Sequence, residues 1–224
     1  MLTEPTHVIA VRHGRTAWNL ATRIQGQLDI GLDDTGRWQA CRLAEALADA
    51  GITALYASDL QRARQTAQAL ADFAGLTIVT DAGLRERGFG VFEGHTHADV
   101  ERLWPAEALR WRQRDPGFGA EGGETLSAFH DRSVACAARL AARHPGETIA
   151  LVSHGGVMDC LYRAATRVGP QAPRTWQLGN ASINRLLYSP EGFTLVGWSD
   201  TQHLDAAVFD GADDAASDAE PRAA

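Results

Sequence analysis

Hydrophobic residues along the chain form short β-branched runs, separated by longer stretches in which apolar residues recur every three or four positions. The runs predict strands at residues 7–11, 53–57, 76–80, 148–153, 184–188 and 193–198. The helical spacing predicts helices at 35–50, 59–74, 125–143 and 156–167, with Gly51 and Gly75 as C-terminal stops of the first two. Strands that alternate with helices predict an α/β fold, with a mostly parallel sheet covered on both faces.

Two segments depart from this alternation. Residues 83–123 are rich in glycine, tryptophan and charge without a clean period, and we interpret them as an insertion that walls a site. Within it, the segment from Trp104 to Trp111 is compatible with a lid that grips the substrate and with an amphipathic helix that packs its tryptophans inward. The helix is the preferred interpretation. Residues 205–224 are acidic and poor in large apolar residues, which predicts a disordered tail after a single domain over 1–204.

Composition narrows the class of protein. The 224 residues suffice for one large α/β domain. The net charge of −7 falls to −2 without the tail, which argues against non-specific binding of nucleic acid. No secretory signal or membrane-length apolar run is evident, so we expect a cytoplasmic protein that binds no membrane. Cys41, Cys136 and Cys160 form no metal or disulfide pattern and are expected to be buried in helices.

Two of the predicted strands end in the same way. The first is followed by Arg12, His13 and Gly14, and the strand at 148–153 is followed by His154 and Gly155. If both strands are parallel, both histidines emerge at the carboxyl edge of the sheet, where α/β proteins bind ligands. A histidine at a strand end is more often a hydrogen-bonded structural residue than a catalytic one, but the occurrence of two, with arginines nearby, favours chemistry.

The surrounding arginines bear on what these histidines do. Arg12 and Arg15 flank His13, and guanidinium groups disfavour a metal ion and favour an anion such as phosphate. Arg62 lies in the first turn of the helix after the strand at 53–57, where Ser58 and Gln61 have capping-box spacing. Nearby positive charge keeps a histidine neutral, which makes His13 a candidate nucleophile toward phosphorus.

An attack on phosphorus also requires a general acid for the leaving oxygen. Glu86 is the best candidate, if Phe89, Phe92 and Trp104 bury it. A surface ion pair with Arg85 or Arg87 is the alternative. His95 and His97 have a spacing that suggests a metal, but a solvent-facing loop is the preferred interpretation.

Several ordered motifs resemble those of the histidine phosphatase superfamily, also called phosphoglycerate mutase-like. They are R-H-G-R-T-A-W-N, R-I-Q-G-Q-L-D, S-D-L-Q-R-A-R-Q-T-A, L-R-E-R-G-F-G-V-F-E-G, G-G-E-T and V-S-H-G-G. The resemblance extends to about Trp198, and the absence of aspartate after His154 places the chain with the mutases and small cytoplasmic phosphatases. It implies a three-layer α/β/α sandwich and no metal.

The resemblance also implies roles for individual residues. His13 is the phosphorylated nucleophile and Glu86 the proton donor and acceptor. The residues implied to hold the phosphoryl group are Arg12, Arg62 and His154, with Asn19 and the Gly155 amide as further contacts. The residues implied to line the substrate entrance are Thr16, Gln25 and Gly26.

Three functions follow from this resemblance. Mutases of the family carry a longer insertion between the equivalents of Glu86 and G-G-E-T, so the shorter one here favours a metal-independent phosphatase of small phosphorylated metabolites. The second is a phosphoglycerate mutase, which alone requires 2,3-bisphosphoglycerate as a cofactor. The third is a non-catalytic phosphate-binding module, for which His13 or Glu86 would be expected to be missing. Both a monomer and a homodimer are compatible with the sequence.

Overall fold

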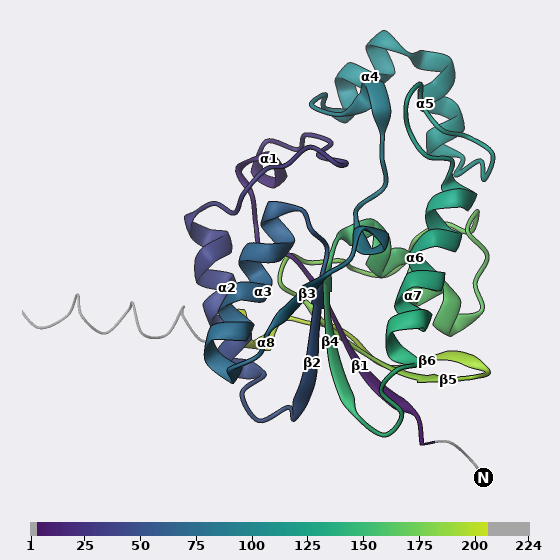
Figure 1. The fold of residues 1–224 in the computed structure, drawn as a ribbon. Helices are drawn as coiled ribbons and strands as arrows, with labels where there is room; N and C mark the ends of the chain where they lie inside the picture. Colours follow the sequence, from purple (N-terminus) through teal and green to yellow (C-terminus); the bar gives the residue numbers. More distant parts are fainter. Residues whose placement is uncertain (1–3, 206–224) are drawn as a thin grey trace, which may run out of the picture.

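A computed structural model describes residues 4–205 and places a six-stranded sheet at the centre of the molecule (Figure 1). The strands are β1 (Thr6–Arg12), β2 (Ile52–Ala57), β3 (Ile78–Thr80), β4 (Thr148–Ser153), β5 (Ile183–Ser189) and β6 (Gly192–Asp200). Their order is β3-β2-β4-β1-β5-β6. The first four are mutually parallel, and β5 and β6 are antiparallel to their neighbours. The prediction of a mostly parallel sheet is therefore confirmed.

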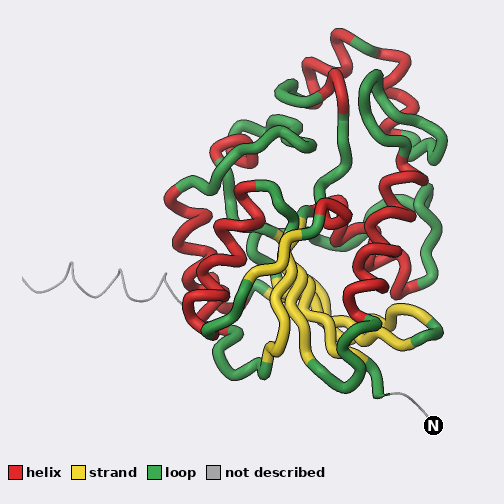
Figure 2. Tube along the Cα trace, in the orientation of Figure 1, coloured by secondary structure: helices red, strands yellow, loops and turns green. Residues whose placement is uncertain are grey.

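Helices cover both faces of this sheet (Figure 2). One face carries α2 (Asp34–Ala46) and α3 (Gln61–Ala74), with α8 (Gln202–Asp205) packed on α2. The other carries α6 (Leu126–Ala141) and α7 (Gly155–Thr166). Side chains of a strand alternate between the faces, so Ile9 and Val11 join one apolar core while Val8 and Ala10 join the other. The result is the expected three-layer α/β/α sandwich.

Residues 83–123, which we call the cap, lie above the carboxyl edge of the parallel strands (Figure 1). The helical elements here are η1 (Ala82–Leu84), η2 (Gly90–Phe92), α4 (His97–Leu103) and α5 (Pro105–Arg112). Phe92 is buried in a small apolar cluster, with its ring 5.4 Å from Trp104 and 5.6 Å from Trp111. Both tryptophans therefore pack on Phe92, as predicted, but each stays half-buried at the edge of this small core of the cap.

The boundaries of two predicted helices differ from the structure, and one short helix was not predicted. The helix expected at 35–50 ends at Ala46. The amides of Ala48 and Ala50 donate to carbonyls three residues earlier instead of four, so the chain turns there. The helix expected from residue 59 begins at Gln61. The four-residue α1 (Ala17–Leu20) is too short to show a helical period and was not predicted.

The cysteine prediction is right for two residues and wrong for one. Cys136 and Cys160 are buried in α6 and α7, whereas Cys41 is exposed. Cys41 lies in α2 next to the buried Ala40, and successive residues of a helix point in different directions, so the Cys41 side chain faces solvent.

Between residues 4 and 205, no helix is both long and apolar enough to cross a membrane. The same residues contain no group of three or more histidine, cysteine or acidic side chains placed to hold a metal ion. Of the predicted acidic tail, only Asp205 is described, as the last residue of α8; residues 206–224 lie outside the described range.

Candidate active site

The two predicted histidines meet because β1 and β4 are adjacent, parallel and in register. Arg12 pairs with Ser153, so the residues that follow them, His13 and His154, leave the sheet side by side. The His13 amide donates to the Ser153 carbonyl at 2.9 Å, and the centroids of the two imidazole rings lie 5.2 Å apart. The backbone register of the core thus places both rings at the carboxyl edge.

His13 is held in one tautomer. Its Nδ1 lies 2.7 Å from the Gly14 carbonyl, which only accepts, so Nδ1 carries the proton and Nε2 keeps its lone pair. The side chain is buried, and burial together with the Arg62 and Arg12 guanidinium groups holds the pKa of His13 well below its usual value. His13 is therefore a neutral imidazole at pH 7 with Nε2 free to attack an electrophile.

Gly14 is needed for close packing at this turn. A Cβ on Gly14 would lie 2.5 Å from the backbone oxygen of Gly36 in α2. The Gly14 amide donates to the Thr66 hydroxyl at 3.0 Å. The missing side chain therefore admits the backbone of α2, and this contact fixes the turn that carries His13.

His154 is oriented by Ser58. Its Nε2 lies 2.8 Å from Ser58 Oγ, which also accepts from the Leu60 amide at 3.3 Å. Within residues 4–205, His154 Nε2 is the only acceptor near the Ser58 hydroxyl, so the hydroxyl donates its hydrogen bond to Nε2. Nε2 therefore carries no proton, and the proton of the neutral imidazole is on Nδ1. This Nδ1 is buried without a partner, as expected of a donor that awaits a ligand oxygen. Burial, Arg62 and His13 hold the pKa of His154 well below its usual value.

The expected capping box at the start of α3 is wrong. The N-cap is Leu60, and Ser58 is occupied by His154. The Gln61 amide instead donates to Asp29, a carboxylate from a distant loop, at 2.6 Å. Because Asp29 takes the Gln61 amide and places a carboxylate at this helix end, the anion site predicted at the start of α3 depends on the Arg62 side chain.

Arg12 and Arg62 provide positive charge beside the histidines. Arg62 is 1% exposed and donates to the carbonyls of Gly26 at 2.7 Å and Leu28 at 2.8 Å. Arg12 donates to the Leu178 carbonyl. The Nε of each arginine is buried without a partner, and burial lowers the pKa of both groups. A buried and a half-buried guanidinium group, each with an unused donor, form a strong site for an oxyanion.

Glu86 enters the same site from the cap. Its carboxylate accepts from the Arg87 amide at 2.8 Å and from the Gly156 amide of α7 at 3.0 Å. A Cβ on Gly156 would lie 2.1 Å from Glu86 Oε1 and 2.9 Å from the Phe129 ring, so any other residue there would displace the Glu86 carboxylate or that ring. Gly156, which the sequence analysis did not select, therefore fixes the position of the candidate acid.

The predicted surroundings of Glu86 are only partly correct. It shares a cavity with Phe89, but Phe92 and Trp104 pack together inside the cap and do not line that cavity. The ion-pair alternative is excluded within the described chain, since Arg85 pairs with Asp59 at 2.6 Å. Arg87 donates to the carbonyls of Glu124 and Phe118. Glu86 is thus left free for a ligand.

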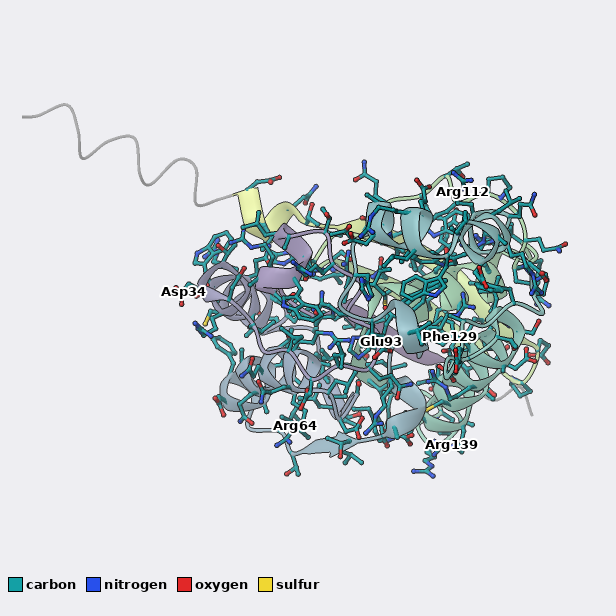
Figure 3. All side chains as sticks on the ribbon, turned by 90° about the horizontal axis from the view of Figure 1, so that it is seen from above. Asp34, Arg64, Glu93, Arg112, Phe129 and Arg139 are labelled. Carbon is teal, nitrogen blue, oxygen red and sulfur yellow. The ribbon has the colours of Figure 1, made fainter. Side chains whose placement is uncertain are left out.

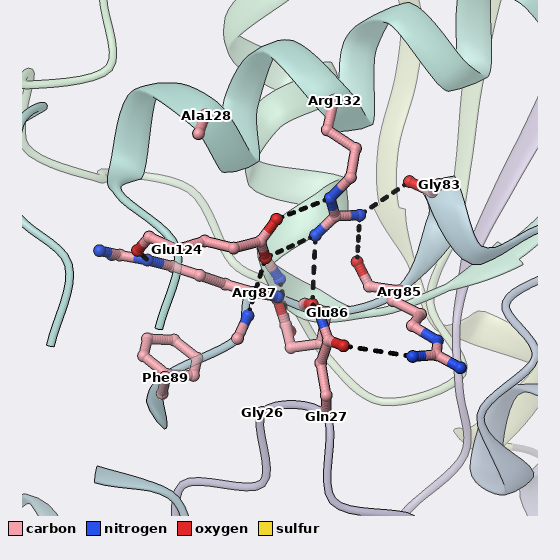
Figure 4. A network of polar contacts seen from close by, with 12 residues as sticks. Gly26, Gln27, Gly83, Arg85, Glu86, Arg87, Phe89, Glu124, Ala128 and Arg132 are labelled. Atoms are coloured by element: carbon pink, nitrogen blue, oxygen red, sulfur yellow. Dashed lines mark hydrogen bonds and ion pairs between the residues drawn. The ribbon is translucent and has the colours of Figure 1, made fainter. Parts of the chain in front are cut away.

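A network around Arg132 of α6 holds the backbone that carries Glu86 (Figure 4). Arg132 donates to the carbonyls of Gly83 at 2.9 Å and Arg85 at 3.0 Å, and more weakly to that of Glu86 at 3.3 Å. It also forms a bidentate ion pair with Glu124, at 2.7 and 2.8 Å. Glu124 belongs to the G-G-E-T motif, and this pairing gives the motif a structural purpose that spacing alone did not indicate.

The predicted entrance residues and the further phosphoryl contacts do not all reach the same cavity. Of the entrance residues, Gln25 and Gly26 line a cavity of about 230 Å³, and so does the predicted phosphoryl contact Asn19. The other lining residues of this cavity include Arg12, His13, Arg62 and Glu86. Thr16 is fully buried, and its hydroxyl caps α1 in a reciprocal pair with Asn19, so it holds the loop and lines none of the cavities described below. Gly155 lines an adjoining groove with Arg12, and a Cβ there would lie 3.3 Å from Arg12 Nε.

The structure also places residues at the site that the sequence did not indicate. Asn180 donates to the His13 carbonyl at 3.0 Å, and Arg174 lies beside Arg12 at the groove. His97 was predicted in a solvent-facing loop, but it begins α4 and lines the cavity with Trp111. His95 does lie in a loop, but it is half-buried against Trp104. His97 is exposed as predicted, but it lies in a helix and its ring meets Trp111 edge-on. The prediction is therefore only partly correct for each histidine.

Comparisons with known proteins agree with this geometry. A family model described as the histidine phosphatase superfamily (branch 1) matches residues 8–201. Phosphoglycerate mutase-like protein 4 of Arabidopsis thaliana is 38% identical over 90% of this chain and 88% of its own. Probable phosphoglycerate mutase GpmB of Yersinia pestis is 37% identical over 91% of this chain and 97% of its own.

Solved structures with this fold include two named as phosphatases. The mycobacterial glucosyl-3-phosphoglycerate phosphatase Rv2419c has a TM-score of 0.79 at 32% identity, and the match covers 88% of this chain and all of that one. The phosphoserine phosphatase of Entamoeba histolytica, solved with 3-phosphoglyceric acid, has a TM-score of 0.79 at 28% identity, over 89% of this chain and 99% of that one.

Proposed function

The chain belongs to branch 1 of the histidine phosphatase superfamily, and we propose that it hydrolyses phosphomonoesters of small metabolites through a phosphohistidine on His13. One observation carries the proposal: the cavity of about 230 Å³ brings together the free Nε2 of His13, the guanidinium groups of Arg12 and Arg62, and the Glu86 carboxyl group. These are a nucleophile, an anion site and a proton donor in one enclosure.

The first step transfers the phosphoryl group to the protein. His13 Nε2 forms a bond to phosphorus while the bond from phosphorus to the alcohol oxygen breaks, and protonated Glu86 gives its proton to that oxygen. Arg12, Arg62 and the His154 Nδ1 proton stabilise the charge on the phosphoryl oxygens. In the second step water attacks phosphorus, Glu86 takes the water's proton, and the bond from phosphorus to His13 breaks to release phosphate.

No step of this proposal needs a metal ion, and the partner is a small phosphorylated metabolite. The chemistry requires only groups present in the chain. Phosphoglycerate mutase is the second candidate, and the names of the relatives from Arabidopsis thaliana and Yersinia pestis favour it. The two differ in what accepts the phosphoryl group from His13, which is water in one case and a second phosphoglycerate oxygen in the other.

One set of assays separates these candidates. With 4-nitrophenyl phosphate in excess chelator, we expect steady phosphate release by the wild type and none above background by His13→Ala. Rapid quenching with ³²P-labelled substrate should trap an acid-labile, base-stable label on the wild type only. Chelator-sensitive turnover would contradict the metal-free proposal, and a label that persists in His13→Ala would remove His13 as the nucleophile.

The mutase is tested with 3-phosphoglycerate, with and without 2,3-bisphosphoglycerate. We expect phosphate release to exceed formation of 2-phosphoglycerate. Interconversion that far exceeds phosphate release, and that depends on the bisphosphate, would identify the chain as a mutase. Binding of phosphate with no turnover of any ester would instead favour the non-catalytic module.

A further inference from the structure

A second cavity, of about 670 Å³, adjoins the phosphate cavity beneath the cap. The two share Glu86, Phe89, His97 and Trp111 as lining residues. Residues from the cap, α6, the start of α7 and the loop around Arg174 enclose it. Glu86 is the proposed donor to the leaving oxygen, so the group esterified to the phosphate lies beside Glu86. Glu86 also lines the groove of Arg12 and Gly155, but only the larger cavity continues from the phosphate cavity past Phe89, His97 and Trp111.

The wall nearest Glu86 is aromatic. The rings of Phe89 and Trp111 lie 5.5 Å apart, and His97 meets Trp111 edge-on at 4.9 Å. Phe129 of α6 contributes a further ring (Figure 3). Flat apolar faces of this kind bind rings by stacking and by burial of apolar area, whereas a short acyclic chain leaves them in contact with water.

The charges of the cavity wall are largely compensated. Arg112 pairs with Glu101 at 3.0 Å, and Arg114 pairs with Asp159 at 2.7 Å. Arg87 donates to the carbonyls of Phe118 and Glu124, and the nearby carboxylates of Glu86 and Glu124 offset its charge. Within residues 4–205, Arg174 forms no ion pair or hydrogen bond, but it lies at the rim beside Arg12, next to the phosphate. The interior therefore suits a neutral group better than a second anion.

We propose that this cavity binds the alcohol portion of the substrate and that this portion carries a neutral ring, which lies against Trp111 and Phe89. This inference rests on the proposed function and narrows its substrate class to phosphomonoesters of ring-bearing alcohols. Its size supports the assignment, because about 670 Å³ lies within the range of cavities that enclose ring-containing ligands and is well above the volume of a three-carbon acid.

The substrate test compares 2-phenylethyl phosphate with propyl phosphate. Both release an unactivated alkyl alcohol, so they need the proton from Glu86 to a similar degree and differ in the ring. We expect the wild type to favour the ring-bearing ester about tenfold or more in kcat/KM. Equal kcat/KM values, or a tenfold preference for 3-phosphoglycerate over the ring-bearing ester, would overturn the inference.

Trp111→Leu should lower this preference to about threefold or less, and Trp111→Phe should retain most of it. Trp38→Leu is the matched control, since Trp38 lies partly exposed on α2 and lines neither cavity, and it should leave the preference unchanged. A preference that survives in Trp111→Leu would contradict the assigned wall.

Binding of the corresponding phosphonates, which cannot be hydrolysed, tests the cavity without turnover. Titration calorimetry should give tighter binding, by about tenfold, for 2-phenylethylphosphonate than for propylphosphonate, and a smaller difference in Trp111→Leu. Ring-selective binding without hydrolysis of any ester would reject the proposed function and keep the cavity assignment. Hydrolysis with no ring selectivity in either experiment would keep the proposed function and reject the cavity assignment.

Discussion

The carboxyl edge of the sheet and the cap above it are built by different means. At the sheet edge, His13, His154 and Arg62 are 3%, 0% and 1% exposed, and backbone register and buried hydrogen bonds hold them. In the cap, half-buried side chains such as Trp111 pack on a small apolar cluster around Phe92. The sheet edge therefore fixes the reacting groups within the main core, and the cap forms the wall of a cavity outside that core.

Glu86 joins these two regions. It belongs to the cap segment, yet its carboxylate accepts from the Gly156 amide of α7, and Arg132 of α6 holds its backbone. The acid is therefore tied to the main core through two helices. This attachment keeps Glu86 in place beside His13, whereas the outer part of the cap only shapes the wall of the larger cavity.

Arg62→Gln should have the largest effect, because it removes a buried cation from the sheet edge. We expect kcat/KM for 4-nitrophenyl phosphate to fall by about 1000-fold, as for loss of a main transition-state donor. Arg64→Gln, on the same helix but pointing to solvent, should stay within about twofold (Figure 3). A small loss in Arg62→Gln, with folding confirmed by circular dichroism, would mean that the phosphate lies elsewhere.

Glu86→Gln tests the residue that joins the regions. Loss of the proton should slow kcat about 100-fold for an alkyl phosphate, and less for 4-nitrophenyl phosphate, whose leaving group needs no proton. The measurement is kcat for both esters in the wild type and the variant. Equal slowing for the two would count against Glu86 as the acid.

The buried histidine His154 predicts a loss of stability in acid. An unfolded histidine takes up its proton near pH 6.5, and the folded His154 does so only well below that pH. Between these values the unfolded chain binds one proton more, so the free energy of unfolding falls as the pH drops below about 6.5, by about 1.4 kcal/mol per unit.

Urea unfolding of the wild type and His154→Gln at pH 7 and pH 5 measures this effect. The wild type should lose about 2 kcal/mol more than the variant on acidification, because glutamine does not titrate. Parallel losses in the two proteins would show that His154 gains its proton as easily in the folded state as in the unfolded chain.

Arg132→Gln should have the smallest of these effects, because Arg132 acts through the position of Glu86. We expect kcat for an alkyl phosphate to fall about tenfold with little change in KM, and by less for 4-nitrophenyl phosphate. Arg139→Gln is the matched control on the same helix, since its exposed side chain pairs with Asp81 and points away from the site (Figure 3). A loss independent of the leaving group would indicate a general structural role.

The sequence predicted the sheet well because its strands are short apolar runs, and the predicted range 148–153 coincides with β4. It was less accurate where a distant segment satisfies the local chain. Ser58 and Gln61 have the spacing of a capping box, but His154 and Asp29 take those hydrogen bonds. Similarly, the family resemblance placed Thr16 at the substrate entrance, but its side chain caps α1 and pairs with Asn19. A helix of four residues shows no period in the sequence, so this cap could not be predicted.

The sequence by itself determined the fold class, the family resemblance and the types of reacting group, because hydrophobic period and ordered motifs are local properties of the chain. Only the tertiary structure decided how these groups are arranged. Strand register brings His13 beside His154, Gly156 and Arg132 fix Glu86, and the packing of Phe92 in the cap leaves Trp111 as the wall of the larger cavity. Each of these depends on contacts between segments far apart in sequence, which no local pattern encodes.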